Sequence, residues 1–260
     1  MEKYEHQLAI VKWVNDLLGP AVASLFHTIE GMIGPRAAEL LGFHVKPGHD
    51  IIPMPLIMAT IVVLFMMVLF TIIRTRFSVE NPGNVQQAFE AVVEFLQGQL
   101  EENVGHAGQK FVAVIGTIAL LLVFSNILGL IPGFASPTGD INLPAGCAIF
   151  MFIYYNYQGM RKQGVGKYLL HFAGPVWWLS PLMIPIEIIS HIARPFSLTV
   201  RLYANIFAEE LLIAVFFSLV AFLLPLPFMA FAIFGGLLQA YIFITLSQVY
   251  LAGAVLTEDH

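Results

Sequence analysis

Long uncharged apolar runs dominate the pattern of this chain. The first extends from Ile51 to Ile73 and is followed by Arg74 and Arg76. About 20 apolar helical residues cross a hydrocarbon core of roughly 30 Å, so this run predicts a membrane-crossing helix over 51–75. Later runs of the same character predict further membrane-embedded helices over 110–131, 142–159, 179–223 and 227–256.

The segment after the first run changes to an amphipathic period. Apolar side chains recur at helical spacing at Val85, Phe89, Val92, Val93, Leu96 and Leu100. Polar side chains such as Glu90 and Glu94 occupy the other face, so 84–104 predicts a helix lying along the membrane surface. Residues 1–50 have no clear period and are assigned to a separate extracytoplasmic segment with one or two short amphipathic helices. Residues 51–260 form the membrane domain.

The run over 179–223 is too long for a simple crossing. A continuous helix of this length extends about 60 Å, roughly twice the thickness of the hydrocarbon core. Strong tilt with a local bend near Pro195 resolves the mismatch, because proline inside a helix removes a backbone hydrogen bond. Together with 227–256 it predicts a long tilted hairpin. The expected fold class is an all-α polytopic membrane protein with about five membrane-embedded helices.

Composition supports this class and excludes others. Hydrophobic residues make up 58% of the chain and charged residues 11%, which is outside the range of soluble globular domains. The net charge of −5 argues against nucleic acid as a partner. Cys147 is the only cysteine, so no internal disulfide forms. No motif for a metal or a cofactor occurs, and we expect neither.

Basic residues predict the orientation of the chain. They gather in two of the loops, at Arg74, Arg76 and Lys110 and at Arg161, Lys162 and Lys167. The positive-inside rule places both loops in the cytoplasm. The N-terminus is then outside, and five crossings bring the C-terminus into the cytoplasm.

Arg201 stands out because its neighbours in the sequence are mainly apolar and aromatic and no other charged residue lies within six positions of it. A charge at the centre of a bilayer costs roughly 2.5–3.5 kcal/mol, so an intramembrane arginine indicates a functional site. The i, i+4 spacing of Ser197, Arg201, Asn205 and Glu209 puts them in a slowly drifting ladder on one helix.

Two further carboxylates lie before and after Arg201 on that helix. At about 100° per residue, Glu187 falls within roughly 40° of the side occupied by Arg201, whereas Glu210 points about 180° away. Arginine does not deprotonate, so it interrupts any path along which protons move between such carboxylates. The interrupted path consists of two half-pathways. A proton crosses the membrane past Arg201 only if a mobile carrier on a partner protein takes it from one half-pathway to the other.

The same residues also have purely structural interpretations. Arg201 is also able to staple helices through an ion pair with Glu209 or Glu187. Asn205 and Gln239 suit ordinary hydrogen bonds between helices. His191 lies one turn after Glu187 and is either an accessory proton relay or a satisfied histidine.

A stand-alone proton-coupled secondary transporter or channel is the alternative function. Such transporters usually show paired repeats with matching interrupted helices, and no repeat occurs here.

Three segments resemble subunit a of F-type ATP synthases. The longest is Arg194-Pro-Phe-Ser-Leu-Thr-Val-Arg201-Leu-Tyr-Ala-Asn205-Ile-Phe-Ala-Glu-Glu210. Pro185-Ile-Glu187 precedes it and belongs to the same resemblance. A second segment begins at Gln239, in the last apolar run. The third comprises Ser125-Asn-Ile-Leu-Gly-Leu-Ile-Pro132 in the second span and Pro137-Thr-Gly-Asp-Ile-Asn142 in the loop after it. The resemblance covers about 50–256.

This resemblance implies a non-catalytic, proton-translocating stator subunit. Its two offset half-channels load and unload carboxylates of the rotating c-ring and couple proton flow to rotation and ATP synthesis. Arg201 matches the arginine that faces the ring carboxylate and prevents a proton short circuit. Positions lining the half-channel open to the outside are matched by Asn205, Glu210 and Gln239. Glu187 matches the cytoplasmic exit.

The same resemblance implies the surroundings and accessory positions of the subunit. His191 and Ser197 are assigned accessory roles. The expected partners are the c-ring subunits, the peripheral-stalk b subunits, the lipid bilayer and, indirectly, the F1 sector. The expected location is the bacterial plasma (inner) membrane, with protons as the default coupling ion.

One feature departs from the family pattern. Many relatives pair the position of Glu210 with a histidine on the last helix, but no histidine occurs over 225–256. Glu209 stands beside Glu210 instead, similar to the Asp-Glu pair of chloroplast-type subunits. We therefore expect Glu209 to share the proton-uptake role with Glu210.

Overall fold

The structure is a computed structural model that describes residues 9–33, 52–75, 77–78, 82–131, 134–166, 168, 180–219 and 225–255. All regular structure in these ranges is helical, which confirms the all-α class. The α-helices are α1 (Ala9–Ile33), α3 (Met54–Thr75), α4 (Asn84–Val104), α5 (Val112–Gly129), α6 (Asn142–Gln163), α8 (Ser180–Leu219) and α9 (Pro225–Val255). Two short 3-10 helices, η1 (His106–Phe111) and η2 (Pro137–Gly139), lie beside α5 and α6.

Some helices extend further than the apolar runs. α6 continues to Gln163, past the end expected at 159, because Arg161 and Lys162 end an apolar run without ending a helix. Gly164 ends α6 with a φ of 81°, which only glycine adopts readily. α1 is one helix of 25 residues rather than one or two short ones. Its flanks 1–8 and 34–51, and the C-terminal residues 256–260, lie outside the described residues.

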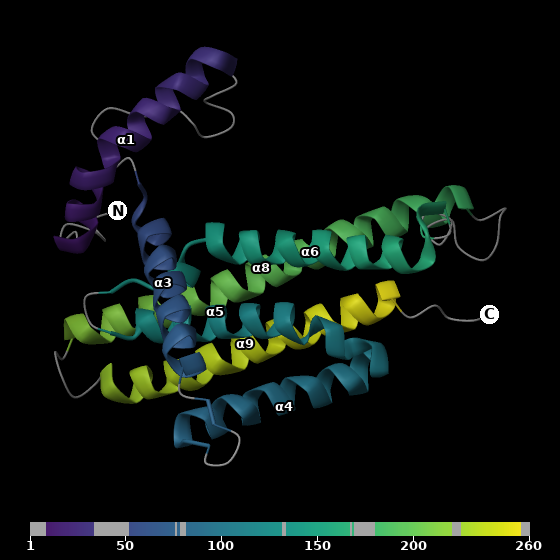
Figure 1. Cartoon of the computed structure of the whole chain (residues 1–260). Coiled ribbons are helices and arrows are strands. Elements are labelled where there is room, and N and C mark those ends of the chain that lie inside the picture. Colours follow the sequence, from purple (N-terminus) through teal and green to yellow (C-terminus); the bar gives the residue numbers. More distant parts are fainter. Residues whose placement is uncertain are drawn as a thin grey trace.

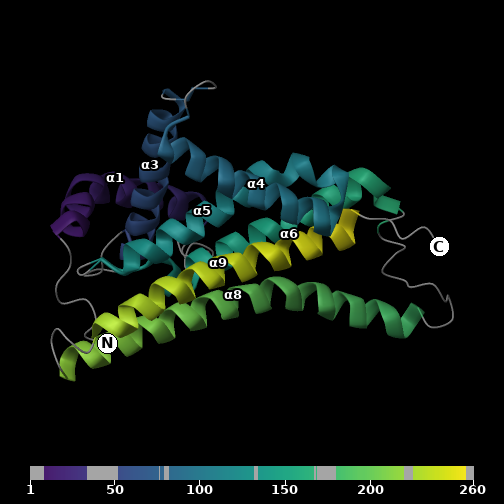
Figure 2. The same cartoon turned by 90° about the horizontal axis from the view of Figure 1, so that it is seen from below.

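α8 and α9 form the long hairpin expected from the sequence. α8 is a continuous helix of 40 residues that contains Pro185 and Pro195, and Figure 2 shows it curving alongside α9. α5 and α6 lie next to this pair, whereas α3 runs across their common direction (Figure 1). The predicted crossing helix α3 therefore differs strongly in orientation from the hairpin and from α5 and α6.

Three described helical segments are long and apolar enough to cross a membrane: Met54–Thr75, Gly108–Gly129 and Leu226–Val255. α6 and α8 carry more polar and charged side chains. Both pack against α9. The molecule is thus a polytopic α-helical membrane protein.

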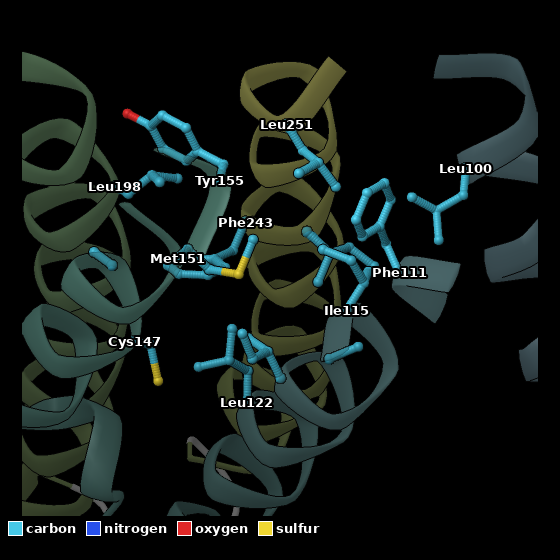
Figure 3. Close-up of a cluster of buried hydrophobic side chains, with 14 of the residues drawn as sticks. Leu100, Phe111, Ile115, Leu122, Cys147, Met151, Tyr155, Leu198, Phe243 and Leu251 are labelled. Atoms are coloured by element: carbon cyan, nitrogen blue, oxygen red, sulfur yellow. The ribbon is translucent and has the colours of Figure 1, made fainter. Parts of the chain in front are cut away.

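The core lies where α4, α5, α6, α8 and α9 meet. Figure 3 shows Leu122, Met151 and Phe243 converging between α5, α6 and α9, with Phe111 and Leu251 further along the same seam. The apolar face of α4 is used only in part: Leu96 and Leu100 are buried, whereas Val85 is exposed.

Candidate functional site

Arg201 lies on the outer side of α8 in this chain. Its neighbours Leu198, Leu202 and Ile206 are buried against the core, whereas Arg201 is exposed. Among the described residues, no carboxylate lies within the 4.0 Å ion-pair distance of Arg201. The interpretation of Arg201 as a helix staple is therefore wrong for the described chain. The guanidinium is free to meet a group on a partner.

The outer side of α8 around Arg201 is apolar. Large apolar side chains exposed on this helix include Leu182, Ile189, Ile192, Phe196, Val200, Phe207, Leu211 and Val215. Ser197, one turn before Arg201, is also exposed. An exposed apolar surface with one permanent cation in it suits a membrane-embedded partner that carries a matching carboxylate.

Glu210 belongs to a polar cluster on the packed side of α8. Its Oε1 atom accepts a hydrogen bond from the backbone N–H of Ser136, at 3.2 Å. Ser136 and Thr138 share a hydroxyl–hydroxyl contact of 2.5 Å, and Thr138 donates to Asn126 Oδ1 at 2.6 Å. Asn126 in turn donates from Nδ2 to the carbonyl of Gly236, at 2.9 Å. The network joins α8, the loop after α5, α5 itself and α9.

Glu209 reaches a different element from Glu210. A Cβ atom added to Gly235 of α9 would collide with Oε1 of Glu209. A Cβ atom added to Gly139 would lie 2.7 Å from Oε1 of Glu210. Each glycine leaves space for one carboxylate. Glu209 therefore points toward α9 and Glu210 toward η2, in agreement with the difference of about 100° between adjacent residues of a helix.

Both carboxylates nevertheless line one small cavity of about 20 Å³. This volume is enough for about one water molecule. The other described lining residues are Asn126, Gly129, Leu130, Ser136, Ile206, Ile213 and Ala232. We call Glu209, Glu210, Asn126, Ser136 and Thr138 the Glu210 cluster.

Sequence reasoning did not single out Asn126, Ser136 and Thr138 as site residues. Their signal was present: Asn126 is a polar residue near the end of an apolar run, and the other two are in the following loop. All three are buried, and a buried polar side chain in this position needs hydrogen-bond partners.

Asn205 and Gln239 connect the two arms of the hairpin. Asn205 Nδ2 donates to Gln239 Oε1 at 2.7 Å, and Gln239 is only 3% exposed. This is the interhelical hydrogen bond expected for two such amides. It holds α9 against α8 one turn after Arg201.

Glu187 belongs to a second cluster near the start of α8. Its Oε1 atom lies 3.5 Å from Nδ1 of His191 and 4.0 Å from a guanidinium nitrogen of Arg194. Arg194 also lies over the Tyr250 ring, 5.3 Å from its centroid. His191 packs edge-on against Tyr155 of α6. We call Glu187, His191, Arg194 and Tyr250 the Glu187 cluster.

The two clusters lie on opposite sides of Arg201 along α8. Glu187 precedes it by about 21 Å and Glu210 follows it by about 14 Å, at 1.5 Å per residue. These separations are too large for direct proton transfer between the clusters. Within the described ranges, no group of three His, Cys, Asp or Glu side chains is placed to hold a metal ion.

The fold and the site together define a class of protein. It is a polytopic helical membrane protein in which one outward-facing arginine, on a long helix, separates two polar clusters. Residues 56–252 match the family model described as ATP synthase A chain. The chain therefore belongs to the ATP synthase subunit a family.

Individual relatives agree with this assignment. The chain is 47% identical over 213 residues to an ATP synthase subunit a of Solibacter usitatus, covering 82% of this chain and 90% of that protein. It is 42% identical over 225 residues to the subunit a of Koribacter versatilis, covering 86% of this chain and 92% of that protein. It is 40% identical over 204 residues to the subunit a of a Sulfurihydrogenibium species, covering 78% and 98%.

Proposed function

We propose that this chain is the proton-translocating stator subunit of an F-type ATP synthase. It forms two offset half-channels that load and unload the carboxylates of a rotating c-ring, and thereby couples proton flow to rotation and ATP synthesis. The observation that carries the proposal is the position of Arg201. It lies exposed on an apolar face, between two polar clusters that are too far apart to exchange protons directly.

The chemistry follows from what each group does with a proton. Arg201 keeps its charge at any accessible pH, so a proton arriving from either cluster does not pass through it. A carboxylate on the c-ring is the carrier: it takes a proton beside one cluster, turns away neutral through lipid and releases the proton beside the other. When ionised it pairs with Arg201, because an unpaired charge in this setting is costly.

Each cluster then has one role. Glu210 and Glu209, with Asn205 and Gln239, form the half-channel open to the outside. Glu187, with His191 as accessory, forms the cytoplasmic exit. Ser197 is an accessory group on the ring-facing side.

The remaining parts of the proposal concern the setting of the subunit. The chain itself carries out no bond chemistry; the F1 sector does so and is coupled to it indirectly. Peripheral-stalk b subunits hold it against the ring. We place it in a bacterial plasma (inner) membrane with the N-terminus outside and the C-terminus cytoplasmic.

Vesicles containing the complete complex test the coupled ion. We expect ATP addition to acidify inverted vesicles equally with and without sodium, and a protonophore to abolish the signal. Acidification that requires sodium, or sodium uptake in place of acidification, contradicts proton coupling.

Cysteine labelling tests the two-sided arrangement. In a Cys147→Ser background, Glu210→Cys should react with a charged thiol reagent added outside, and Glu187→Cys with the same reagent added to the cytoplasmic side. Leu211→Cys is the matched control, because Leu211 follows Glu210 and is exposed on the apolar face of α8. It should react poorly from both sides. Labelling of positions 187 and 210 from one side only would rule out two half-channels.

A further inference from the structure

We infer that a pocket at one end of the bundle binds the headgroup of an acidic phospholipid. The pocket has a volume of about 430 Å³. Its lining residues come from η1, α6 and α9. The C-terminal ends of α6 and α9 lie at the same end of the bundle (Figure 1). The lining residues are Lys110, Phe111, Tyr154, Gln158, Arg161, Lys162 and Val255.

The charge of the pocket selects an anion. Three of its described lining residues are cations, Lys110, Arg161 and Lys162, and none is acidic. All three side chains belong to exposed residues, so water and lipid headgroups reach them. Arginine suits a phosphate because its planar fork donates two hydrogen bonds, and basic pockets between membrane helices favour anionic headgroups.

The floor of the pocket is apolar and aromatic. Phe111 and Val255 are each 1% exposed, so they form a closed base. Tyr154 packs edge-on against Phe111, with the ring centroids 6.2 Å apart. Lys110 Nζ lies 5.0 Å from the Phe111 ring centroid, which keeps this ammonium over the floor. The pocket therefore offers cations above an apolar base.

An exposed apolar stripe on α6 leads away from the pocket. Phe150, Ile153 and Tyr157 are 51%, 61% and 54% exposed. At 100° per residue they share one side of α6 with Arg161. Phe150 also stacks on Tyr154, with the ring centroids 6.1 Å apart. The stripe provides a track for acyl chains below a bound phosphate, which a soluble phosphate would not use.

This site is separate from the groups assigned to proton transfer. No member of the Glu210 or Glu187 cluster lines it. Binding there is measurable without any proton flow, so the test does not depend on the proposed function.

Native mass spectrometry of the full-length chain in nonionic detergent tests the proposal. The probes are phosphatidylglycerol and phosphatidylcholine with identical acyl chains, and sn-glycerol 3-phosphate as the soluble headgroup. We expect phosphatidylglycerol to bind more tightly than phosphatidylcholine and the soluble headgroup not to compete. Equal binding of the two lipids, or full competition by the soluble headgroup, would overturn the lipid assignment.

Paired variants locate the site. Arg161→Gln with Lys162→Gln should weaken phosphatidylglycerol binding about thirty-fold, which corresponds to about fivefold for each basic residue lost. Lys12→Gln with Arg74→Gln removes the same charge from exposed positions outside the pocket and should leave binding unchanged. Equal losses in the two pairs would show nonspecific charge attraction and refute the site.

Two further measurements test whether altered membrane insertion explains the loss of binding and whether a protein carboxylate fills the pocket instead of a lipid. Gln158→Glu keeps all three cations, so the basic residues that predict the orientation of the chain in the membrane are unchanged. It adds a negative charge to the pocket wall and should therefore weaken binding of phosphatidylglycerol. In the complete complex, carbodiimide should not cross-link Lys110 or Lys162 to a carboxylate of any subunit. Efficient cross-linking would show that a protein carboxylate fills the pocket, and the lipid proposal would fall.

Discussion

We expect replacement of Arg201 by alanine to abolish proton-driven ATP synthesis while leaving the complex assembled. Within the described chain Arg201 makes no ion pair, so its removal leaves no described carboxylate without an ion-pair partner. The packed neighbours Leu198, Leu202 and Ile206 keep α8 in place. In the proposed mechanism, what is lost is the fixed cation that separates the two half-channels and pairs with the ring carboxylate. The measurement is ATP synthesis in energised vesicles, normalised to the amount of assembled complex.

Three comparisons make this result specific. The alanine variant should also leak protons passively, because no fixed cation then prevents a ring carboxylate from carrying protons between the two clusters without rotation. Arg201→Lys should restore little synthesis, since a desolvated lysine sheds its proton where arginine does not. Arg74→Ala removes an exposed arginine at the end of α3 and should retain near-normal synthesis. Near-normal synthesis in Arg201→Ala would refute the role assigned to this residue.

We expect the double change Glu209→Gln with Glu210→Gln to cost far more proton conduction than the two single changes combined. Both carboxylates line the same small cavity, and no other described residue that lines it is ionisable. Each single variant keeps one proton acceptor and loses conduction only in part. The double variant keeps none. We expect an excess loss of roughly 5- to 150-fold, which corresponds to a coupling of about 1–3 kcal/mol.

The structure also predicts that the two single variants differ. In Glu210→Gln the amide oxygen is still able to accept the hydrogen bond from the Ser136 N–H. Glu209 approaches Gly235 of α9, so the amide of Glu209→Gln enters a tight contact. Passive proton conduction through the isolated membrane sector measures all three variants. Glu94→Gln, on the exposed side of α4, is the control without effect.

Additive logarithmic losses would show that the glutamates act independently. Glu209 would then become a residue of the helix interface, since the described structure gives it no ion pair with Arg201.

Local properties of the chain were enough to predict the helices and the central arginine. Hydropathy over a window and the spacing of Pro and Gly are local, so the apolar runs predicted α3, α5 and α9 closely. The length of the run over 179–223 alone implied a hairpin longer than the bilayer is thick. The helical spacing of Glu209 and Glu210 likewise predicted that they point to different sides, because angle along one helix depends only on sequence separation.

Contacts between distant segments were decided only by the tertiary structure. The chain from Glu210 through Ser136, Thr138 and Asn126 to Gly236 joins four elements, and no periodicity within one element encodes it. The convergence of Lys110, Arg161 and Lys162 on one pocket depends in the same way on how α6 and α9 end beside η1. A sequence specifies which face each helix turns to its neighbours, but the distances between side chains on different helices arise only when those faces pack together.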